Sequence, residues 1–533
     1  MFISACINIG DDEQAAKWEP LVKSLKMTGC YAQTELGHGS FVQGVETTAT
    51  FDKATQEFVI NTPTITATKF WPGDMSKMSN HAVVFAKLII DGKAYGVHAF
   101  MMQTRNLETW ELLPGIECGD IGPKFGYNSK DNGYMLFKNV RVPRTNMLKR
   151  FAEVTEEGKI VIKSDMRRLY GIMLETRVWI AGNSGISLAA ALTIAGRYSV
   201  VRRQFSSQDG TKQERKLLDY QTHMFKFAPL LAYSNAFNFA SQHLFINHRL
   251  LLEEMKKDNF ERLDLLHHLT AGYKAVFSRI SYDGIDTCRQ ACGGAGFSAH
   301  SGLPSMQVDY APNTTYEGDN TVMLQQCARL IMKTWKAVHV KGNPEKAQGL
   351  FSYIKDAQSL LASKSSIKSV EDTNCLNRLE EALAVRALFR IKKTMDQIFK
   401  AEKDGVSDNE RVNSLFSVDI VQMAQAHIIY IVFKLFRKAV EDGGELKIKC
   451  NGIKKNMTLL LRLLALYDIQ NSDSSALYEA GYFGAGTAPV LLEATKKILV
   501  ELRPQMIPLL ESWEFPDEAL ISAIGNSYGD IYE

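Results

Sequence analysis

The pattern of apolar and polar residues divides the chain into a β-rich part and a longer helical part. Between about residues 31 and 155, short runs of apolar and β-branched residues alternate with turn signals. Two pairs of these runs predict hairpins: Thr47–Phe51 with Glu57–Ile60, and His81–Ile90 with Lys93–Met102. Asp91-Gly92 joins the second pair and favours a tight two-residue turn. This part of the chain is therefore predicted to form a β domain.

From about residue 160 the apolar residues recur at spacings of three and four, which predicts helices. The predicted helical stretches are Arg168–Arg203, Lys216–Met255 and Leu263–Gln290 in a first block, and Leu379–Ala401, Ser414–Val440, Leu459–Ile469 and Leu491–Leu510 in a second. Helices of this length are typical of bundles. Residues 1–30 are also predicted to be helical, after the acidic start Asp11-Asp12-Glu13.

We therefore predict an α+β fold in which a central β domain is followed by two helical-bundle domains. The predicted boundaries are 1–30 for a short helical segment, 31–155 for the β domain, 156–340 for the first helical domain, 341–375 for a polar connector and 376–533 for the second helical domain.

Composition and charge exclude several classes of protein. With 62 Lys and Arg against 59 Asp and Glu, the 533 residues carry no strong basic field for nucleic acid. The longest apolar runs, such as Ile428–Phe433, are shorter than the roughly 18 residues of a membrane span. Cys288 and Cys292 lie four apart with no histidine pair near them, which favours buried thiols over a zinc site. His267-His268 is expected at the surface rather than on a metal.

Two segments in the β part carry unusual residues, Tyr31–Ser40 and Thr68–Asp74. In the first, glycines bracket His38, and Thr34 and Ser40 supply hydroxyls that could bind a polar ring edge. A plain loop entering the β domain is the alternative. In the second, Trp71 beside Pro72-Gly73 could line a planar ligand, although core packing is the simpler expectation.

Two further segments, Cys292–Phe297 and Tyr316–Thr321, lie in the helical part. A helix C-cap explains one of the glycines 293, 294 and 296, which leaves a ligand contact open for the others. Asp319 or Asn320 is a good N-cap for the next helix. Glu317 before it is either a surface acid or a general base, and a base needs burial to raise its pKa.

Together these segments resemble the acyl-CoA oxidases, flavoenzymes related to the acyl-CoA dehydrogenases. Tyr31–Ser40 is similar to the flavin-contacting loop of that family. Gly119–Tyr127, Ala291–Gly296 and Thr315–Val322 resemble further oxidase signatures. The resemblance extends over essentially the whole chain and includes the second helical block, which dehydrogenases of ordinary size lack.

The resemblance implies a reaction. It is the FAD-dependent oxidation of a fatty acyl-CoA to a trans-2-enoyl-CoA, with O₂ reduced to hydrogen peroxide, as in the first step of peroxisomal β-oxidation. Glu317 matches the base that removes the α-proton, and its backbone N–H matches a donor to the thioester oxygen. Arg177 matches an arginine near the base in substrate binding, or is simply a paired helix arginine.

The resemblance also implies cofactor contacts and a homodimer. The positions matched to FAD are Thr34 and Gly73 at the isoalloxazine ring, the hydroxyl of Ser40, Arg202 and Gln221 reaching the cofactor of a neighbouring subunit, and Gly293 and Gly294 along its phosphates or adenine. Acyl-CoA and O₂ are the implied partners, and no metal is implied.

Two departures from the family keep alternatives open. Asp319 stands where the family more often has Glu. The chain is also expected to lack most of the family's first helical domain and the extreme C-terminus, with its peroxisomal targeting tripeptide. A non-catalytic oxidase-like subunit for assembly or acyl-CoA binding is therefore the alternative, and an acyl-CoA dehydrogenase is disfavoured by the second helical block.

Overall fold

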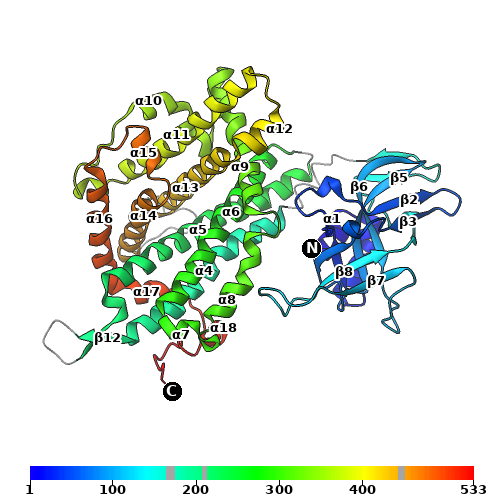
Figure 1. Cartoon of the computed structure of the whole chain (residues 1–533), viewed down its shortest axis with the longest axis horizontal. Helices are drawn as coiled ribbons and strands as arrows, with labels where there is room; N and C mark the ends of the chain where they lie inside the picture. Colours follow the sequence, from blue (N-terminus) through cyan, green and yellow to red (C-terminus); the bar gives the residue numbers. More distant parts are fainter. Residues whose placement is uncertain (164–173, 207–212, 258, 442–449, 533) are drawn as a thin grey trace. The chain divides into compact units, whose positions relative to one another are not determined.

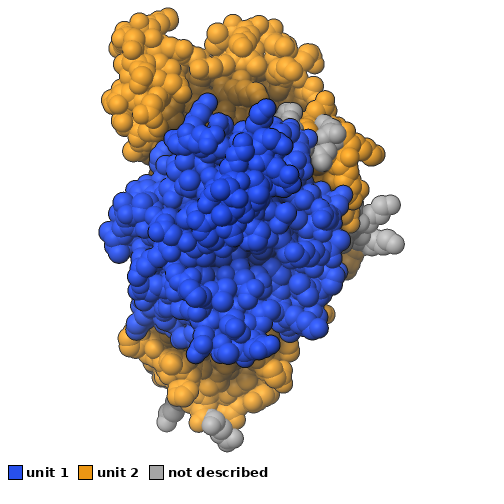
Figure 2. Space-filling model, turned by 90° about the vertical axis from the view of Figure 1, so that its right-hand side faces the viewer, with its two compact units in different colours: residues 1–176 blue, residues 177–533 orange. Residues whose placement is uncertain are grey.

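The computed structural model describes residues 1–163, 174–206, 213–257, 259–441 and 450–532. The chain divides into two compact units, Met1–Thr176 and Arg177–Glu533, which Figure 2 distinguishes by colour. The first unit contains the two larger sheets, and the second is almost entirely helical (Figure 1). The mixed α+β prediction is confirmed, while the finer domain boundaries stay a prediction.

The strands of the first unit form a large and a small sheet with one further ribbon. They are β1 (Gly29–Ala32), β2 (Thr48–Asp52), β3 (Glu57–Asn61), β4 (Lys69–Gly73), β5 (His81–Ile90), β6 (Lys93–Gln103), β7 (Ile116–Asp120), β8 (Asn132–Phe137), β9 (Val140–Pro143), β10 (Ala152–Val154) and β11 (Ile160–Ile162). The large sheet has the order β1-β5-β2-β3-β9, with β6 paired to β5, and the small sheet has the order β4-β8-β7.

Both predicted hairpins are confirmed. Strands β2 and β3 pair antiparallel with Phe51 opposite Phe58, and β5 pairs antiparallel with β6. Asp91 and Gly92 both have positive φ, 48° and 75°, as a two-residue turn of this kind requires.

Strand β5 is buried on both of its faces. Val84 belongs to the hydrophobic core that the large and small sheets share, whereas Phe85 packs with helices α1 (Phe2–Asn8) and α2 (Asp12–Lys23). This division follows from the alternation of side chains along a strand. Helix α2 starts with a capping box formed by Asp11 and Gln14, so residues 1–30 are helical as predicted up to Lys23.

The second unit is built from helices, of which several are long and others have only one turn (Figure 1). They are α4 (Glu175–Val201), α5 (Gln221–Met255), α6 (Leu263–Ala291), α7 (Gly293–Phe297), α8 (Leu303–Tyr310), α9 (Asn320–Trp335), α10 (Ala357–Ala362), α11 (Leu376–Lys403), α12 (Asp408–Glu410), α13 (Ser417–Glu441), α14 (Asn451–Asn471), α15 (Ser475–Glu479), α16 (Thr487–Leu502), α17 (Met506–Glu511) and α18 (Asp517–Leu520). A short ribbon of β12 (Arg203–Ser206) and β13 (Glu214–Lys216) connects α4 to α5.

The predicted helical stretches correspond to observed helices, with one correction. Residues 168–173, where the first stretch was predicted to begin, lie outside the described residues. The stretch Leu491–Leu510 is not one helix: a 3₁₀ turn at Arg503–Gln505 separates α16 from α17. Pro504 lies in this turn, and proline cannot donate the backbone hydrogen bond that continues a helix.

The two helical blocks pack against each other. Helix α13 of the second block contacts α5, α6 and α9 of the first, and α14 contacts α5. Of the described helices, α4 and α13 are long and apolar enough to cross a membrane, but 72% and 61% of their most apolar windows are buried inside the fold. Burial of this kind is typical of core helices.

A hydrogen-bond network of buried polar side chains lies between the blocks. Tyr353 donates to His427 Nδ1 (2.6 Å), the Nε2 atoms of His427 and His268 are 3.2 Å apart, and His268 Nδ1 lies 2.8 Å from the Cys327 carbonyl. One proton on His427 Nε2 and one on His268 Nδ1 satisfy every link with both rings neutral. The surface prediction was wrong for His268, which is fully buried, because α13 covers it.

This hydrogen-bond network predicts a loss of stability in acid. Burial lowers the pKa of His268 to about 4 and holds the pKa of His427 well below 6.5. Unfolding lets both rings take up protons near pH 6.5, so this contribution is present above pH 6.5 and is lost as the pH falls towards 4. We expect the denaturation midpoint to fall more between about pH 7 and about pH 5 in the wild type than in His427→Phe. Equal losses would contradict the prediction.

Candidate active site

The two unusual segments of the first unit lie side by side. The N–H of Phe70 donates to the Thr34 carbonyl (3.0 Å), and the N–H of Leu36 donates to the Thr68 carbonyl (2.8 Å). The loop that carries Thr34 therefore runs along the start of β4, the strand that ends at Gly73. These backbone bonds place two of the residues matched to FAD on neighbouring segments.

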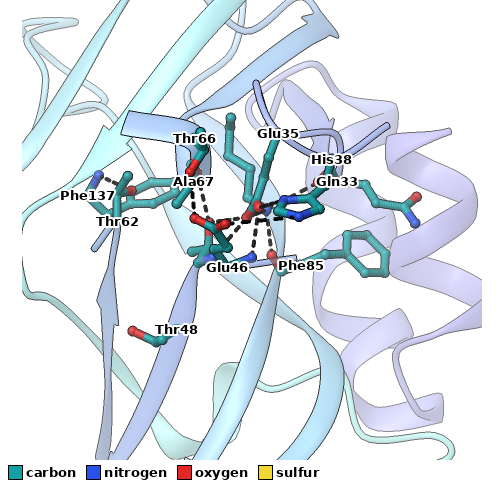
Figure 3. A network of polar contacts seen from close by, with 12 residues as sticks. Gln33, Glu35, His38, Glu46, Thr48, Thr62, Thr66, Ala67, Phe85 and Phe137 are labelled. Carbon is teal, nitrogen blue, oxygen red and sulfur yellow. Dashed lines mark hydrogen bonds and ion pairs between the residues drawn. The ribbon is translucent and has the colours of Figure 1, made fainter. Parts of the chain in front are cut away.

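A buried carboxylate holds this loop in place (Figure 3). Glu35 is 2% exposed and accepts from Lys69 Nζ (3.0 Å), from the Thr47 N–H (2.9 Å) and hydroxyl (2.6 Å), and from the Glu46 N–H (2.8 Å). Burial alone would raise the pKa of Glu35, but the charge of Lys69 and these donors hold it below its usual value. Glu35 is therefore the ionised partner of Lys69.

Lys69 lies on β4, and its ammonium group connects that strand to two other segments of the chain. Besides Glu35, it donates to the carbonyls of Gln33 (3.2 Å) and Phe85 (2.7 Å), so all three of its N–H donors are used. Burial lowers its pKa to about 8, although Glu35 opposes this. The pair thus links the Tyr31–Ser40 loop, β4 and β5, and it is a support that sequence reasoning missed.

Among the residues of the two unusual segments, Trp71, Gly73 and Ser40 are exposed or partly exposed. Trp71 is 53% exposed and has a φ of +87°, so the expectation of core packing was wrong. Asn132 donates to its carbonyl (2.6 Å) across the bulge between β4 and β8. A Cβ on Gly73 would lie 2.5 Å from Lys130 Cε, the far end of a flexible side chain that can move aside, so packing alone does not require this glycine and its contact with FAD stays a prediction. Ser40 is exposed.

In the second unit, Glu317 lies in the short loop that precedes α9. Its φ is +57°, a left-handed conformation that is rare for a residue other than glycine. Among the residues that the structure describes, neither its carboxylate nor its backbone N–H has a hydrogen-bond partner. Burial raises the pKa of Glu317, although the positive charges of Arg177 and Lys274 oppose this. The carboxylate is half-buried, so the plain surface acid is not what the structure contains.

Two cations contact the backbone of this loop rather than its carboxylate. Arg177, near the start of α4, donates from Nε to the Glu317 carbonyl (2.9 Å). Lys274 of α6 donates to the Gly318 carbonyl (2.6 Å) and to Asn320 Oδ1 (2.9 Å). Asp319 caps α9 by accepting from the Thr321 N–H. Arg177 was expected near the base, whereas Lys274 gave no signal, since one lysine in a helix is ordinary.

Two further residues matched to FAD, Arg202 and Gln221, lie at the far end of α4. Arg202 follows α4 and Gln221 begins α5, and the Leu217 N–H donates to the Arg202 carbonyl (2.9 Å). The guanidinium of Arg202 donates to the Tyr532 hydroxyl (2.9 Å). A helix rises 1.5 Å per residue, so Arg177 and Arg202 are about 37 Å apart along α4.

The glycines after α6 have separate explanations. Gly293 has a φ of +60°, the left-handed position that commonly ends a helix. A Cβ on Gly296 would lie 2.0 Å from the Arg289 carbonyl oxygen, so packing requires this glycine. Gly294 alone has neither reason, because a Cβ there would meet nothing within 4 Å. A cofactor contact stays a prediction for Gly293 and Gly294, and of the two only Gly294 lacks a structural reason of its own.

The described residues contain no group of three or more His, Cys, Asp or Glu side chains that could hold a metal ion. Cys288 and Cys292 are buried free thiols, as the sequence indicated. The candidate chemistry of the second unit therefore rests on one carboxylate and two cations, and that of the first unit on a loop and strand edge with an exposed indole.

Comparison with protein families gives two matches. The family described as "Acyl-CoA oxidase, C-alpha1 domain" matches residues 170–332, and that described as "Acyl-CoA oxidase" matches residues 375–533. Among curated proteins, peroxisomal acyl-coenzyme A oxidase 1 of Homo sapiens is 39% identical over 100% of this chain and 80% of its own length. The putative peroxisomal acyl-coenzyme A oxidase 1.2 of Arabidopsis thaliana is 38% identical over 100% and 79%.

Solved structures agree. Arabidopsis thaliana acyl-CoA oxidase 1 superposes with a TM-score of 0.94 at 38% identity, covering 100% of this chain and 79% of its own. Acyl-CoA oxidase-1 of Caenorhabditis elegans, complexed with FAD and ATP, gives a TM-score of 0.90 at 34% identity, covering 100% and 77%.

Proposed function

This chain belongs to the acyl-CoA oxidase family, and we propose that it oxidises fatty acyl-CoA to trans-2-enoyl-CoA with FAD, passing the electrons to O₂. Its relatives are named peroxisomal, and we assign the chain to the same compartment and to β-oxidation of fatty acids. The single observation that carries the proposal is the unpaired, half-buried carboxylate of Glu317, on a loop whose backbone carbonyls accept from two cations.

Glu317 is suited to remove the α-proton of the acyl-CoA. Burial raises the pKa of its carboxyl, so it accepts a proton more readily than a solvated glutamate. Its backbone N–H, which has no acceptor among the described residues, is available to the thioester oxygen, where negative charge develops as the proton leaves. Arg177 holds the carbonyl of the same residue and keeps the loop in place.

The residues of the first unit fit a flavin. The ion pair of Glu35 and Lys69 holds the Tyr31–Ser40 loop in place. The indole ring of Trp71 lies outside the core and is exposed. We assign Thr34, Ser40 and Gly73 to the isoalloxazine side. When bound, FAD would accept the hydride from the β-carbon and pass its two electrons to O₂, which becomes hydrogen peroxide.

We also propose that the active enzyme is a homodimer in which Arg202 and Gln221 serve the partner's cofactor. The support is the separation of about 37 Å along α4 between Arg202 and the base-side Arg177. Mixing Glu317→Gln with Arg202→Ala tests this, because only a mixed dimer acting across subunits contains one intact site. Recovery of activity on mixing is expected, and none after verified subunit exchange would contradict it.

The absorbance spectrum of the purified protein tests the proposed function. We expect flavin bands that bleach when saturated acyl-CoA esters of several lengths are added without O₂, and that return with hydrogen peroxide when O₂ is admitted. A protein with no flavin, or with flavin that no acyl-CoA reduces, would overturn the enzyme in favour of a non-catalytic subunit. Reoxidation by an electron-transfer protein but not by O₂ would indicate a dehydrogenase.

A further inference from the structure

The loop that carries Glu317 adopts an unfavourable backbone conformation. Glu317 (φ +57°) and Gly318 (φ +105°) follow each other with positive φ. A glutamate in this region persists only where its surroundings hold it. The contacts that hold these two residues are therefore part of what positions the carboxylate.

The contact at Gly318 comes from a buried lysine. Lys274 is 0% exposed on α6, and its ammonium group donates to the Gly318 carbonyl (2.6 Å) and to Asn320 Oδ1 (2.9 Å). Asn320 is itself fixed, because its amide donates to the Ala275 carbonyl (3.1 Å) and to the Ser278 hydroxyl (3.0 Å). Lys274 thus connects the buried middle of α6 to the loop directly after Glu317.

Lys274 lacks the usual compensation for a buried charge. Within the described ranges, no carboxylate oxygen lies within 4 Å of its ammonium group, so it forms no ion pair. Burial and the charge of Arg177 lower its pKa to about 8, against the opposing effect of Asp319 and Glu317. A methionine would fill similar space without this cost. What the lysine adds is two strong hydrogen bonds to the loop and a positive charge near Glu317.

We propose that Lys274 is a positioning residue for the reaction, whose ammonium group clamps Gly318 and Asn320 and so fixes the orientation of the Glu317 carboxylate. This inference rests on the proposed function, in which Glu317 is the base. Arg177 holds the loop from α4 at the Glu317 carbonyl, and Lys274 holds it from α6 one residue later.

The clamp has an electrostatic consequence. Arg177 and Lys274 are the charged side chains of the second unit that lower the pKa of Glu317, against burial, which raises it. Removing the charge of Lys274 leaves burial less opposed, so the pKa of Glu317 rises further. The base acts only when deprotonated, and the acid limb of the pH–rate profile therefore moves to higher pH.

Lys274→Met in the flavin-loaded enzyme tests the proposal. The rate constant for anaerobic flavin reduction by palmitoyl-CoA is measured against pH, together with flavin content, the dissociation constant for palmitoyl-CoA and the thermal midpoint. We expect at least about a tenfold slower reduction and an acid limb at higher pH, with flavin content and the dissociation constant unchanged. Lys274→Gln, which keeps a donor but not the charge, should regain part of the rate and keep the shifted limb.

The control is Tyr273→Phe on the same helix. The Tyr273 hydroxyl is buried and has no hydrogen-bond partner among the described residues, so rate and pH profile should match the wild type. A wild-type rate and acid limb in Lys274→Met would overturn the proposal. If that variant does not fold, the same result in Lys274→Gln would overturn it. Wild-type protein without flavin, or with flavin that no acyl-CoA reduces, would instead contradict the proposed function.

Discussion

Replacing Glu317 by Gln is expected to slow flavin reduction by acyl-CoA by about 10²–10⁴-fold, the contribution of a positioned general base. The amide has the size of the carboxylate but cannot accept the α-proton. The carbonyl of residue 317 still accepts from Arg177, so the loop and the bound flavin should be retained. Anaerobic stopped-flow reduction, with flavin content measured in parallel, gives the result.

Glu514→Gln is the matched control for this variant. Glu514 is also a glutamate with a positive φ, 54°, but it is exposed, between α17 and α18. The same chemical change in the same backbone conformation should leave the rate unaltered. Flavin reduction at the wild-type rate in Glu317→Gln would remove Glu317 from its role.

Asp468→Asn is expected to lower the free energy of unfolding of the helical unit by about 3–5 kcal/mol, the cost of leaving a buried charge without its partner. Asp468 and Arg386 are each 1% exposed and form an ion pair between α14 and α11. Arg386 also donates to the Ser472 carbonyl (2.5 Å), and the Tyr233 hydroxyl of α5 donates to Asp468 (2.7 Å). The asparagine keeps an acceptor for Tyr233 but leaves the guanidinium unpaired.

Two comparisons make this prediction specific. Asp396→Asn breaks the exposed Lys392–Asp396 pair on α11 and should cost no more than about 1 kcal/mol. Adding Arg386→Met to Asp468→Asn removes the unpaired charge and should recover much of the lost stability. Chemical denaturation measures all of these proteins. Equal small losses in Asp468→Asn and Asp396→Asn would contradict the prediction.

Local patterns were sufficient for most of the elements. Asp91-Gly92 specifies its hairpin because both residues tolerate positive φ, and Asp319 caps α9 because its side chain reaches the N–H of Thr321. The prediction was less successful for Trp71 and His268, since hydrophobicity and residue type do not say which neighbour covers a side chain. Trp71 is exposed, and α13 buries His268 from more than 150 residues away.

The sequence by itself determined the elements, the family and the identity of the candidate base, because helix and strand periods, caps and short motifs are local in the chain. Only the tertiary structure decided what surrounds that base. Arg177 and Lys274 lie 140 and 43 residues before Glu317, and packing of α4 and α6 against the loop brings them to its backbone. Burial and charge at such a site depend on these distant contacts, and so does the pKa of the carboxylate.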